Sequence, residues 1–122
     1  MLFKKHFTVD EALKTLPLVK RIVQDILNTG HQIRSLTTVL EGESENHPQV
    51  EALMDELKSY FAELEEIGCY YKDWNFSIGL VDFPAIIDGK EVFLCWRSDE
   101  PEIQYYHEIE AGYVGRRRIL DL

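Results

Sequence analysis

Around Gly68 the spacing of apolar residues changes from one in every three or four positions to one in every two. The first spacing is typical of an α-helix that packs along another helix, and the second of a β-strand with one buried face. Both patterns in one chain of 122 residues predict a single α+β domain. We expect a helical hairpin over residues 8–67, an antiparallel sheet over residues 69–110 that packs on the hairpin, and an arginine-bearing tail over residues 111–122.

The first helix is predicted to begin at Thr8, because Thr8 and Glu11 have the spacing of a capping box. Beyond it, small or apolar residues recur at alternate steps of four and three, the spacing of one helix packed along another. These residues are Val19, Val23, Ile26, Gly30, Ile33, Thr37 and Leu40. Pro17 lies early in this segment. Because proline removes a helical hydrogen bond, we expect a kink or a new helix start there.

The second helix is predicted from Pro48, which suits a first helical turn, to Gly68, which suits a left-handed C-terminal cap. Residues 41–47 before it read as a polar, acidic loop. The two helices are expected to pack antiparallel, as a hairpin. The first helix is apolar over a wide arc, so we expect the sheet to leave part of it exposed. Such a surface favours a homodimer.

Asp88-Gly89 indicates a two-residue β-hairpin turn, because a type I′ turn needs positive φ at both positions. Counting outward from this turn pairs Ile87 with Lys90 and Asp82 with Cys95. One face of the hairpin is then almost wholly apolar and is predicted to be buried. It carries Val81, Phe83, Ala85, Ile87, Val92, Leu94 and Trp96.

Three shorter predictions complete the sheet. Residues 69–74 and 103–107 are each expected to form a short antiparallel strand. Pro84 cannot donate a hydrogen bond to a neighbouring strand, so we expect its strand to be an edge there or to carry a bulge.

The chain is acidic, with 13 Lys and Arg against 22 Asp and Glu and a net charge of −9. This charge opposes binding to phosphate backbones, so no nucleic-acid role is expected. No apolar run reaches the ~18 residues of a membrane span, and no signal peptide is recognisable. Cys69 and Cys95 have no closely spaced partners. We therefore expect no disulfide framework and a reducing cytoplasm.

Two groups of polar residues in the sheet are candidates for a site. The register places Asp82, Cys95 and Arg97 on one face, where they suit either a structural ion pair or an anion clamp with a reactive partner. A nucleophilic Cys95 would need a neighbour that stabilises its thiolate, and Asp82 opposite it would not.

The second group is His107, Glu108 and Glu110, residue types that hold a divalent metal or act as a general base. Their spacing matches no standard zinc signature, so a hydrogen-bonded structural histidine is the alternative. Residues 116–118 are three arginines, which suit either an anion or a solvated tail.

Several short motifs follow one another in the C-terminal half. They are Gly-Leu-Val-Asp-Phe-Pro-Ala (79–85), Leu-Cys-Trp-Arg (94–97), Glu-Pro-Glu-Ile (100–103), Tyr-His-Glu (106–108) and Gly-Tyr-Val-Gly-Arg (112–116). With Phe-Thr-Val-Asp-Glu-Ala (7–12), they make nearly the whole chain resemble a bacterial family, domain of unknown function 2203. The resemblance implies a prokaryotic cytoplasmic protein and brings no activity. It also implies that the polar residues of these C-terminal motifs matter.

We therefore expect a small cytoplasmic binding domain, with or without catalytic ability. Its site, on the C-terminal sheet, would hold a small anionic ligand or a divalent metal. The ligand-binding candidates are Asp82, Arg97, Glu100, His107 and Arg116. The alternative, from a different class, is a protein–protein interaction module that assembles through the helical hairpin and has no active site.

Overall fold

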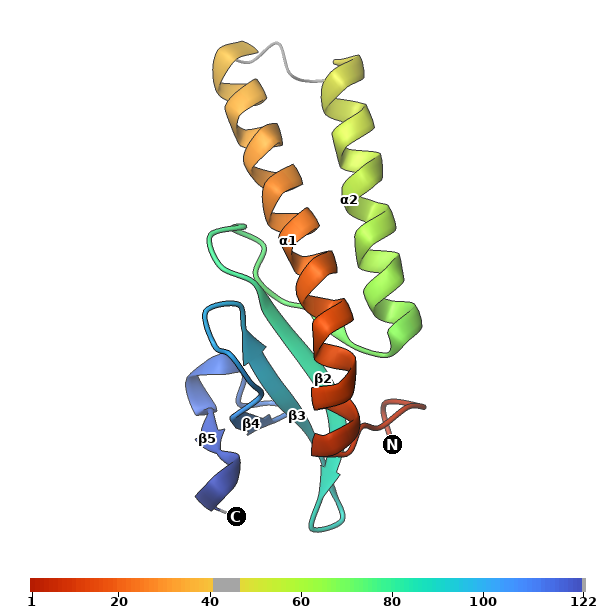
Figure 1. The fold of residues 1–122 in the computed structure, drawn as a ribbon, viewed down its shortest axis with the longest axis vertical. Coiled ribbons are helices and arrows are strands. Elements are labelled where there is room, and N and C mark those ends of the chain that lie inside the picture. Colours follow the sequence, from red (N-terminus) through yellow and green to blue (C-terminus); the bar gives the residue numbers. More distant parts are fainter. Residues whose placement is uncertain (41–46, 122) are drawn as a thin grey trace.

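The computed structural model describes residues 1–40 and 47–121, and it has the predicted α+β fold (Figure 1). Two helices, α1 (Val9–Leu40) and α2 (Pro48–Ile67), precede a five-stranded antiparallel sheet. The predicted acidic loop lies outside the described residues, except for His47. Neither described helix combines the length and apolar character that a membrane span requires.

The capping box at the start of α1 is confirmed. The amide of Glu11 donates to Thr8 Oγ1 at 3.0 Å, and the amide of Thr8 donates to Glu11 Oε1 at 3.2 Å. The predicted new start at Pro17 is wrong, because one helix runs through it. Leu16 and Val19 on either side of the proline are buried in the core. Tertiary packing therefore holds this turn of the helix despite the lost hydrogen bond.

Helix α2 begins and ends as predicted. Pro48 is its first residue, and the His47 side chain accepts a hydrogen bond from the Gln49 amide. Gly68 caps the other end with a φ of 109°, and its amide donates to the carbonyl oxygens of Leu64 and Glu65. In Figure 1 the two helices run side by side in opposite directions, and the sheet lies against only one end of the pair.

The sheet is a meander in which each strand pairs with the next. Its strands are β1 (Tyr70–Tyr71), β2 (Leu80–Ile87), β3 (Lys90–Arg97), β4 (Tyr105–Glu108) and β5 (Arg117–Arg118). The first strand is shorter than predicted. The last was not predicted, because residues 117–118 were assigned to the irregular, arginine-bearing tail.

The hairpin between β2 and β3 has the predicted turn and register. Asp88 and Gly89 have φ values of 51° and 75°, and Asp82 is paired with Cys95. Strand β1 pairs only with Val81 and Asp82, so on that side β2 is an edge at Pro84, whereas β3 pairs with it on the other side. Instead, the backbone amide of Phe7 donates to the carbonyl oxygen of Pro84 at 2.7 Å.

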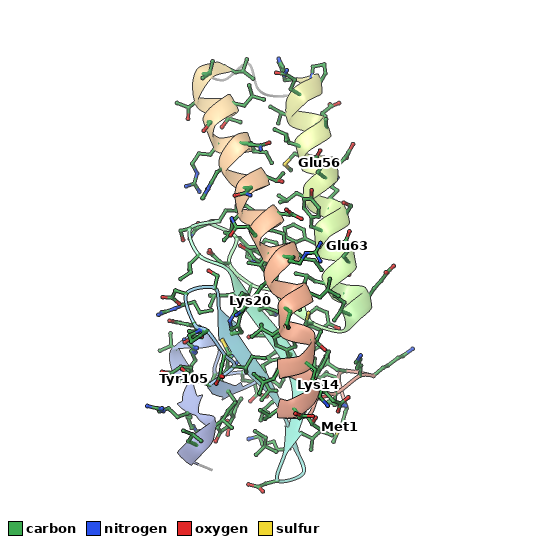
Figure 2. All side chains as sticks on the ribbon, viewed as in Figure 1. Met1, Lys14, Lys20, Glu56, Glu63 and Tyr105 are labelled. Atoms are coloured by element: carbon green, nitrogen blue, oxygen red, sulfur yellow. The ribbon has the colours of Figure 1, made fainter. Side chains whose placement is uncertain are left out.

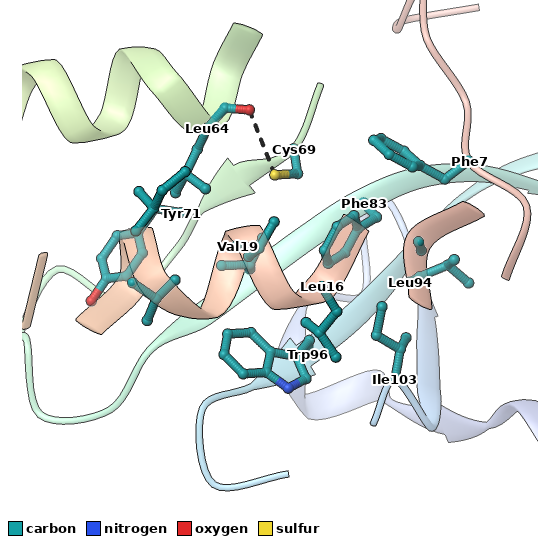
Figure 3. Close-up of a cluster of buried hydrophobic side chains, with 14 of the residues drawn as sticks. Phe7, Leu16, Val19, Leu64, Cys69, Tyr71, Phe83, Leu94, Trp96 and Ile103 are labelled. Atoms are coloured by element: carbon teal, nitrogen blue, oxygen red, sulfur yellow. Dashed lines mark hydrogen bonds between the residues drawn. The ribbon is translucent and has the colours of Figure 1, made fainter. Parts of the chain in front are cut away.

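The helix-facing side of the sheet forms the core together with the first half of α1 (Figure 3). Trp96, Phe83 and Leu94 are fully buried there and pack with residues such as Leu16 and Val19. Lys20 of α1 reaches the loop after β3, where its ammonium group donates to the carbonyl oxygen of Pro101 at 3.0 Å (Figure 2). These contacts fix the sheet against α1.

The middle of the opposite side of the sheet is also buried, although only the first side was predicted to be. Asp82, Pro84, Phe93 and Cys95 are all buried there. The N-terminal segment covers part of this side, since the Phe3 ring lies 5.2 Å from the Phe93 ring. The polar side chains of Asp82 and Cys95 are therefore shielded from solvent on this face.

Candidate metal centre

Three potential metal ligands, one from each of three consecutive strands, meet on the side of the sheet that faces away from the helices. Asp82 lies on β2, Cys95 lies opposite it on β3, and His107 lies on β4 opposite Phe93. Their side chains are buried, with residue exposures of 4%, 1% and 2%. One ligand atom from each of the three lies within 4.8 Å of the other two. Strand alternation puts all three on one face, and strand pairing brings them together.

The hydrogen bonds of His107 define which ring nitrogen is available. Its Nδ1 lies 2.8 Å from the backbone carbonyl oxygen of Glu108, and a carbonyl oxygen only accepts. Nδ1 therefore carries a proton and donates. The other nitrogen, Nε2, faces Asp82 Oδ1 at 3.3 Å. In a neutral imidazole this Nε2 is an acceptor, as is a carboxylate, so a proton or another cation must lie between the two.

Without a metal, that cation is a proton. Burial alone would lower the pKa of His107, but its hydrogen bonds to Asp82 and to the Glu108 carbonyl raise the pKa, and the net shift is upward. The pKa of the Cys95 thiol is raised to about 12, chiefly by burial and then by the charge of Asp82. The metal-free centre thus favours a proton between His107 and Asp82, beside a protonated thiol.

The donor set also matches the ligands of zinc. Thiolate sulfur, imidazole nitrogen and carboxylate oxygen all bind Zn²⁺, at bond lengths that separate tetrahedral ligand atoms by roughly 3.3–3.6 Å. The 3.3 Å between His107 Nε2 and Asp82 Oδ1 is close to that spacing. The bond from His107 Nδ1 to a carbonyl oxygen is the usual outer contact of a metal-binding histidine. Side-chain shifts of about 1 Å would close the 4.8 Å cluster around one ion.

A cavity of about 250 Å³ opens onto the three ligands. Lys72 and Tyr113 supply its other polar groups, and Leu80, Phe93 and Ile109 supply apolar walls. An ion held by three protein ligands would have its remaining position available on the cavity side. A larger cavity, of about 680 Å³, lies between the two helices and contains none of these ligands.

The side chains of the other predicted ligand-binding residues, Arg97, Glu100 and Arg116, are each engaged in an ion pair. The Arg97 guanidinium pairs with Asp99, its Nε 2.6 Å from Oδ1, and also donates to the hydroxyl oxygen of Tyr113. Arg116 Nη2 donates to both carboxylate oxygens of Glu100, at 2.6 and 2.7 Å. The structure therefore brings Asp82 and His107 together, and uses the three remaining candidates to hold the segments beside them.

Arg116 lies next to the cluster without joining it. Its guanidinium packs between the rings of Tyr105 and Tyr113, 4.0 and 4.8 Å from their centroids. Its pairing with Glu100 leaves both side chains largely buried. We interpret this ion pair as the support that fastens the C-terminal segment over β3, because Arg116 Nη2 also lies 3.5 Å from the Cys95 carbonyl oxygen.

The structure does not gather the predicted set of His107, Glu108 and Glu110. Alternation along β4 turns Glu108 away from His107, and its carboxylate lies 3.1 Å from Lys90 Nζ. Glu110 is exposed after the strand. Among the described residues, the ligands that do meet His107 come from β2 and β3, and Cys95 had been considered as a reactive partner or nucleophile but not as a metal ligand. Predicting that Cys95 lies beside His107 would have required the register of β4 against β3.

The comparisons with known proteins identify a family and nothing more specific. Residues 5–119 match the family model described as "Uncharacterized conserved protein (DUF2203)". Neither the curated proteins nor the solved structures contain a significant match.

Proposed function

We propose that this chain, which belongs to the DUF2203 family, binds a divalent transition metal through Asp82, Cys95 and His107. The supporting observation is that three buried side chains of metal-binding type converge from three strands to within 4.8 Å. A structural ion pair would need only the aspartate and the histidine. A bound metal would also account for the position of the Cys95 thiol beside this pair.

Zinc is the ion that this donor set favours. Magnesium and calcium prefer oxygen ligands alone, whereas a thiolate with an imidazole suits zinc and similar ions. Three protein ligands with one position facing a cavity is the composition of catalytic zinc sites, in which that position holds water or a substrate atom. Bound zinc would be neutralised by the two anionic ligands, Asp82 and the Cys95 thiolate.

A thiolate ligand also indicates a compartment. Both cysteines are free, and Cys95 must stay reduced to bind a metal. We therefore infer a reducing, cytoplasmic setting, and from the family resemblance a bacterial one.

The metal proposal is tested by elemental analysis of protein purified without chelators, before and after incubation with zinc and gel filtration. We expect about one zinc per wild-type chain and a loss of most of that zinc in Cys95→Ser. The matched control is Cys69→Ser, since Cys69 is also buried but its Sγ contacts the Leu64 carbonyl oxygen on the helix side. Wild-type protein that retains no zinc, or equal zinc in both variants, would contradict the proposal.

A second candidate function, self-assembly, is favoured by the part of the helical pair that the sheet does not cover. We call residues 30–40 of α1 and 48–57 of α2 the distal arm. The described buried residues of α1 end at Gly30, and Val39 is 76% exposed. The 680 Å³ cavity is a groove along this arm. Its described lining residues are His31, Gln32, Ser35, Leu36, Val39, Gln49, Ala52 and Leu53.

A second copy of the chain is the partner that this groove suits. Two chains of net charge −9 repel one another unless they meet through an uncharged surface. None of the eight described lining residues is Asp, Glu, Lys or Arg. A two-fold axis would pack the groove against itself and produce a four-helix bundle. The α1 part of the arm is roughly 16 Å long, too short for a standard interface of about 800 Å² per partner, so the dimer should be weak.

Sedimentation velocity over micromolar to millimolar concentrations tests this second candidate. We expect a concentration-dependent dimer that Leu36→Glu abolishes. Leu120→Glu is the control, because Leu120 is 83% exposed near the C-terminus, outside the distal arm. A wild-type monomer at every concentration, or equal dimerisation of both variants, would contradict self-assembly through the arm.

A further inference from the structure

We propose that the metal-loaded centre binds a small organic carboxylate, with its anionic group between the metal, Lys72 and Tyr113. This inference rests on the proposed metal binding and specifies the class of ligand that the site accepts. Its structural basis is the 250 Å³ cavity, in which one cationic and one hydroxyl group share the lining with the three metal ligands.

The charges around the cavity favour a monoanion. A divalent ion is neutralised by the Asp82 carboxylate and the Cys95 thiolate. The other nearby cations are neutralised by partners, since Arg97 pairs with Asp99 and Arg116 with Glu100. Within the described part of the chain, Lys72 makes no salt bridge. The loaded cavity therefore carries a charge of about +1, which a single carboxylate would balance.

Lys72 is positioned beside the metal ligands by both its backbone and its side chain. Its amide donates to the carbonyl oxygen of Leu80 at 2.8 Å, just beyond the end of β1. Its Nζ lies 5.3 Å from the centre of the Phe93 ring, and that ring packs edge-to-face with the His107 ring, their centres 5.6 Å apart. The ammonium group is thus held near the open side of the centre, where it can donate to an anion that also binds the metal.

Tyr113 offers the second donor. Its hydroxyl oxygen accepts a hydrogen bond from the Arg97 guanidinium, which leaves the hydroxyl hydrogen to donate elsewhere. The positive charge of Arg97 polarises that O–H bond. Because Tyr113 lines the same cavity as Lys72, the two can donate to the two oxygens of one carboxylate.

The volume and apolar walls of the cavity indicate the size and polarity of the ligand beyond its carboxylate. At about 30 Å³ for each water, 250 Å³ corresponds to roughly eight water volumes, and therefore to a ligand of about that many heavy atoms. Leu80, Phe93 and Ile109 provide apolar walls that suit a short hydrocarbon chain. A dianion such as phosphate would exceed the available positive charge and would find few polar partners beyond the metal.

The test uses the cobalt(II)-loaded protein, whose visible spectrum responds to a new ligand on the metal, and sodium butyrate as the probe. Metal content is measured first for each protein. We expect a saturable spectral change in the wild type and in the control Lys90→Met, whose lysine pairs with Glu108 instead. Lys72→Met and Tyr113→Phe should retain the metal and bind butyrate about tenfold more weakly, as the loss of a charge-assisted or polarised donor predicts.

The outcomes separate this inference from the metal proposal. Metal-loaded protein without a saturable response, or with equal butyrate affinity in Lys72→Met, Tyr113→Phe and the wild type, would overturn the carboxylate site alone. Tighter binding of inorganic phosphate than of butyrate would overturn the carboxylate assignment. Failure of the wild type to hold any metal would overturn both proposals. Tyr113→Phe keeps the ring that packs on Arg116, so its butyrate affinity still tests the carboxylate site if Lys72→Met does not fold.

Discussion

Asp82 and His107 approach to 3.3 Å although their strands are not neighbours, because β2 and β4 both pair with β3. Two strand spacings separate their backbones by roughly 9.6 Å, so the two side chains must lean toward each other over the central strand. Cys95 lies on that central strand. A proton shared by the aspartate and the histidine accounts for their approach. A metal accounts for that approach and also for the presence of the thiol beside them.

Zinc should stabilise the folded protein against heat. An ion that binds only the folded state adds about 2.7 kcal/mol to the free energy of unfolding when its free concentration is one hundred times Kd. We expect zinc to raise the Tm of the wild type and to leave the Tm of His107→Gln unchanged, as measured by differential scanning calorimetry. Magnesium serves as the matched ion control, since it prefers oxygen ligands. Equal effects of zinc on both proteins would argue against the centre.

Cys95 should react slowly with thiol reagents in the folded, metal-free protein. Burial raises the pKa of both Cys95 and Cys69 to about 12, so both thiols stay protonated and unreactive at pH 8. Labelling with iodoacetamide followed by mass spectrometry should modify neither cysteine until the protein is unfolded with urea. Rapid, stoichiometric modification of Cys95 in the folded protein would indicate an activated nucleophile instead.

The N-terminal segment should detach from the sheet in acid. The Glu91 carboxylate accepts hydrogen bonds from the amides of Leu2 and Phe3, and it pairs with His6 at 2.7 Å. Burial acts to raise the pKa of Glu91, but these hydrogen bonds outweigh it and lower the pKa below the usual value of about 4.5. The contribution of Glu91 to stability is therefore present above pH 4.5 and is lost as the pH falls through the folded-state pKa.

Hydrogen exchange with mass spectrometry checks this pH dependence. Exchange in residues 1–7, corrected for the intrinsic effect of pH, should rise below pH 4.5, and Glu91→Gln should raise it at neutral pH. Unchanged protection of the segment in Glu91→Gln at neutral pH would show that the carboxylate does not anchor it.

Gly79 should not tolerate a side chain. A Cβ at this position would overlap Cγ1 of Val23, which is fully buried in α1. We expect Gly79→Ala to reduce the free energy of unfolding by about 1–3 kcal/mol, as overpacked cores do, with a lower urea midpoint and an unchanged m value. Combining it with Val23→Ala should cost less than the sum of the two single changes, since the shortened side chain makes room. Additive losses would show that the two residues do not compete for space.

Local signals predicted much of this fold. Asp88-Gly89 determined both the turn and the register of β2 against β3, because a two-residue turn leaves no freedom in the pairing. Gly68 marked the end of α2 for a similarly local reason, its left-handed conformation. Pro17 misled because its local cost is outweighed by the burial of Leu16 and Val19, which depends on a sheet far along the chain.

The site was only half predictable. Asp82 and Cys95 were paired correctly, since both belong to the hairpin with the defined turn. The pairing of His107 with Phe93 depends on residues 98–104, a connection long enough to permit several registers. Tyr105, Tyr106 and His107 also give no alternation of apolar and polar residues, so the sequence does not identify which face His107 occupies. Lys72 was missed because it was assigned to a strand over residues 69–74, whereas β1 ends before it.

X-ray absorption at the zinc K-edge of the loaded wild-type protein tests the central claim most directly, because it counts the sulfur atoms bound to the metal. We predict one sulfur at about 2.3 Å and nitrogen or oxygen ligands at about 2.0–2.2 Å, with the sulfur absent from any zinc that Cys95→Ser retains. Zinc surrounded only by nitrogen and oxygen in the wild type would contradict the Asp82–Cys95–His107 centre.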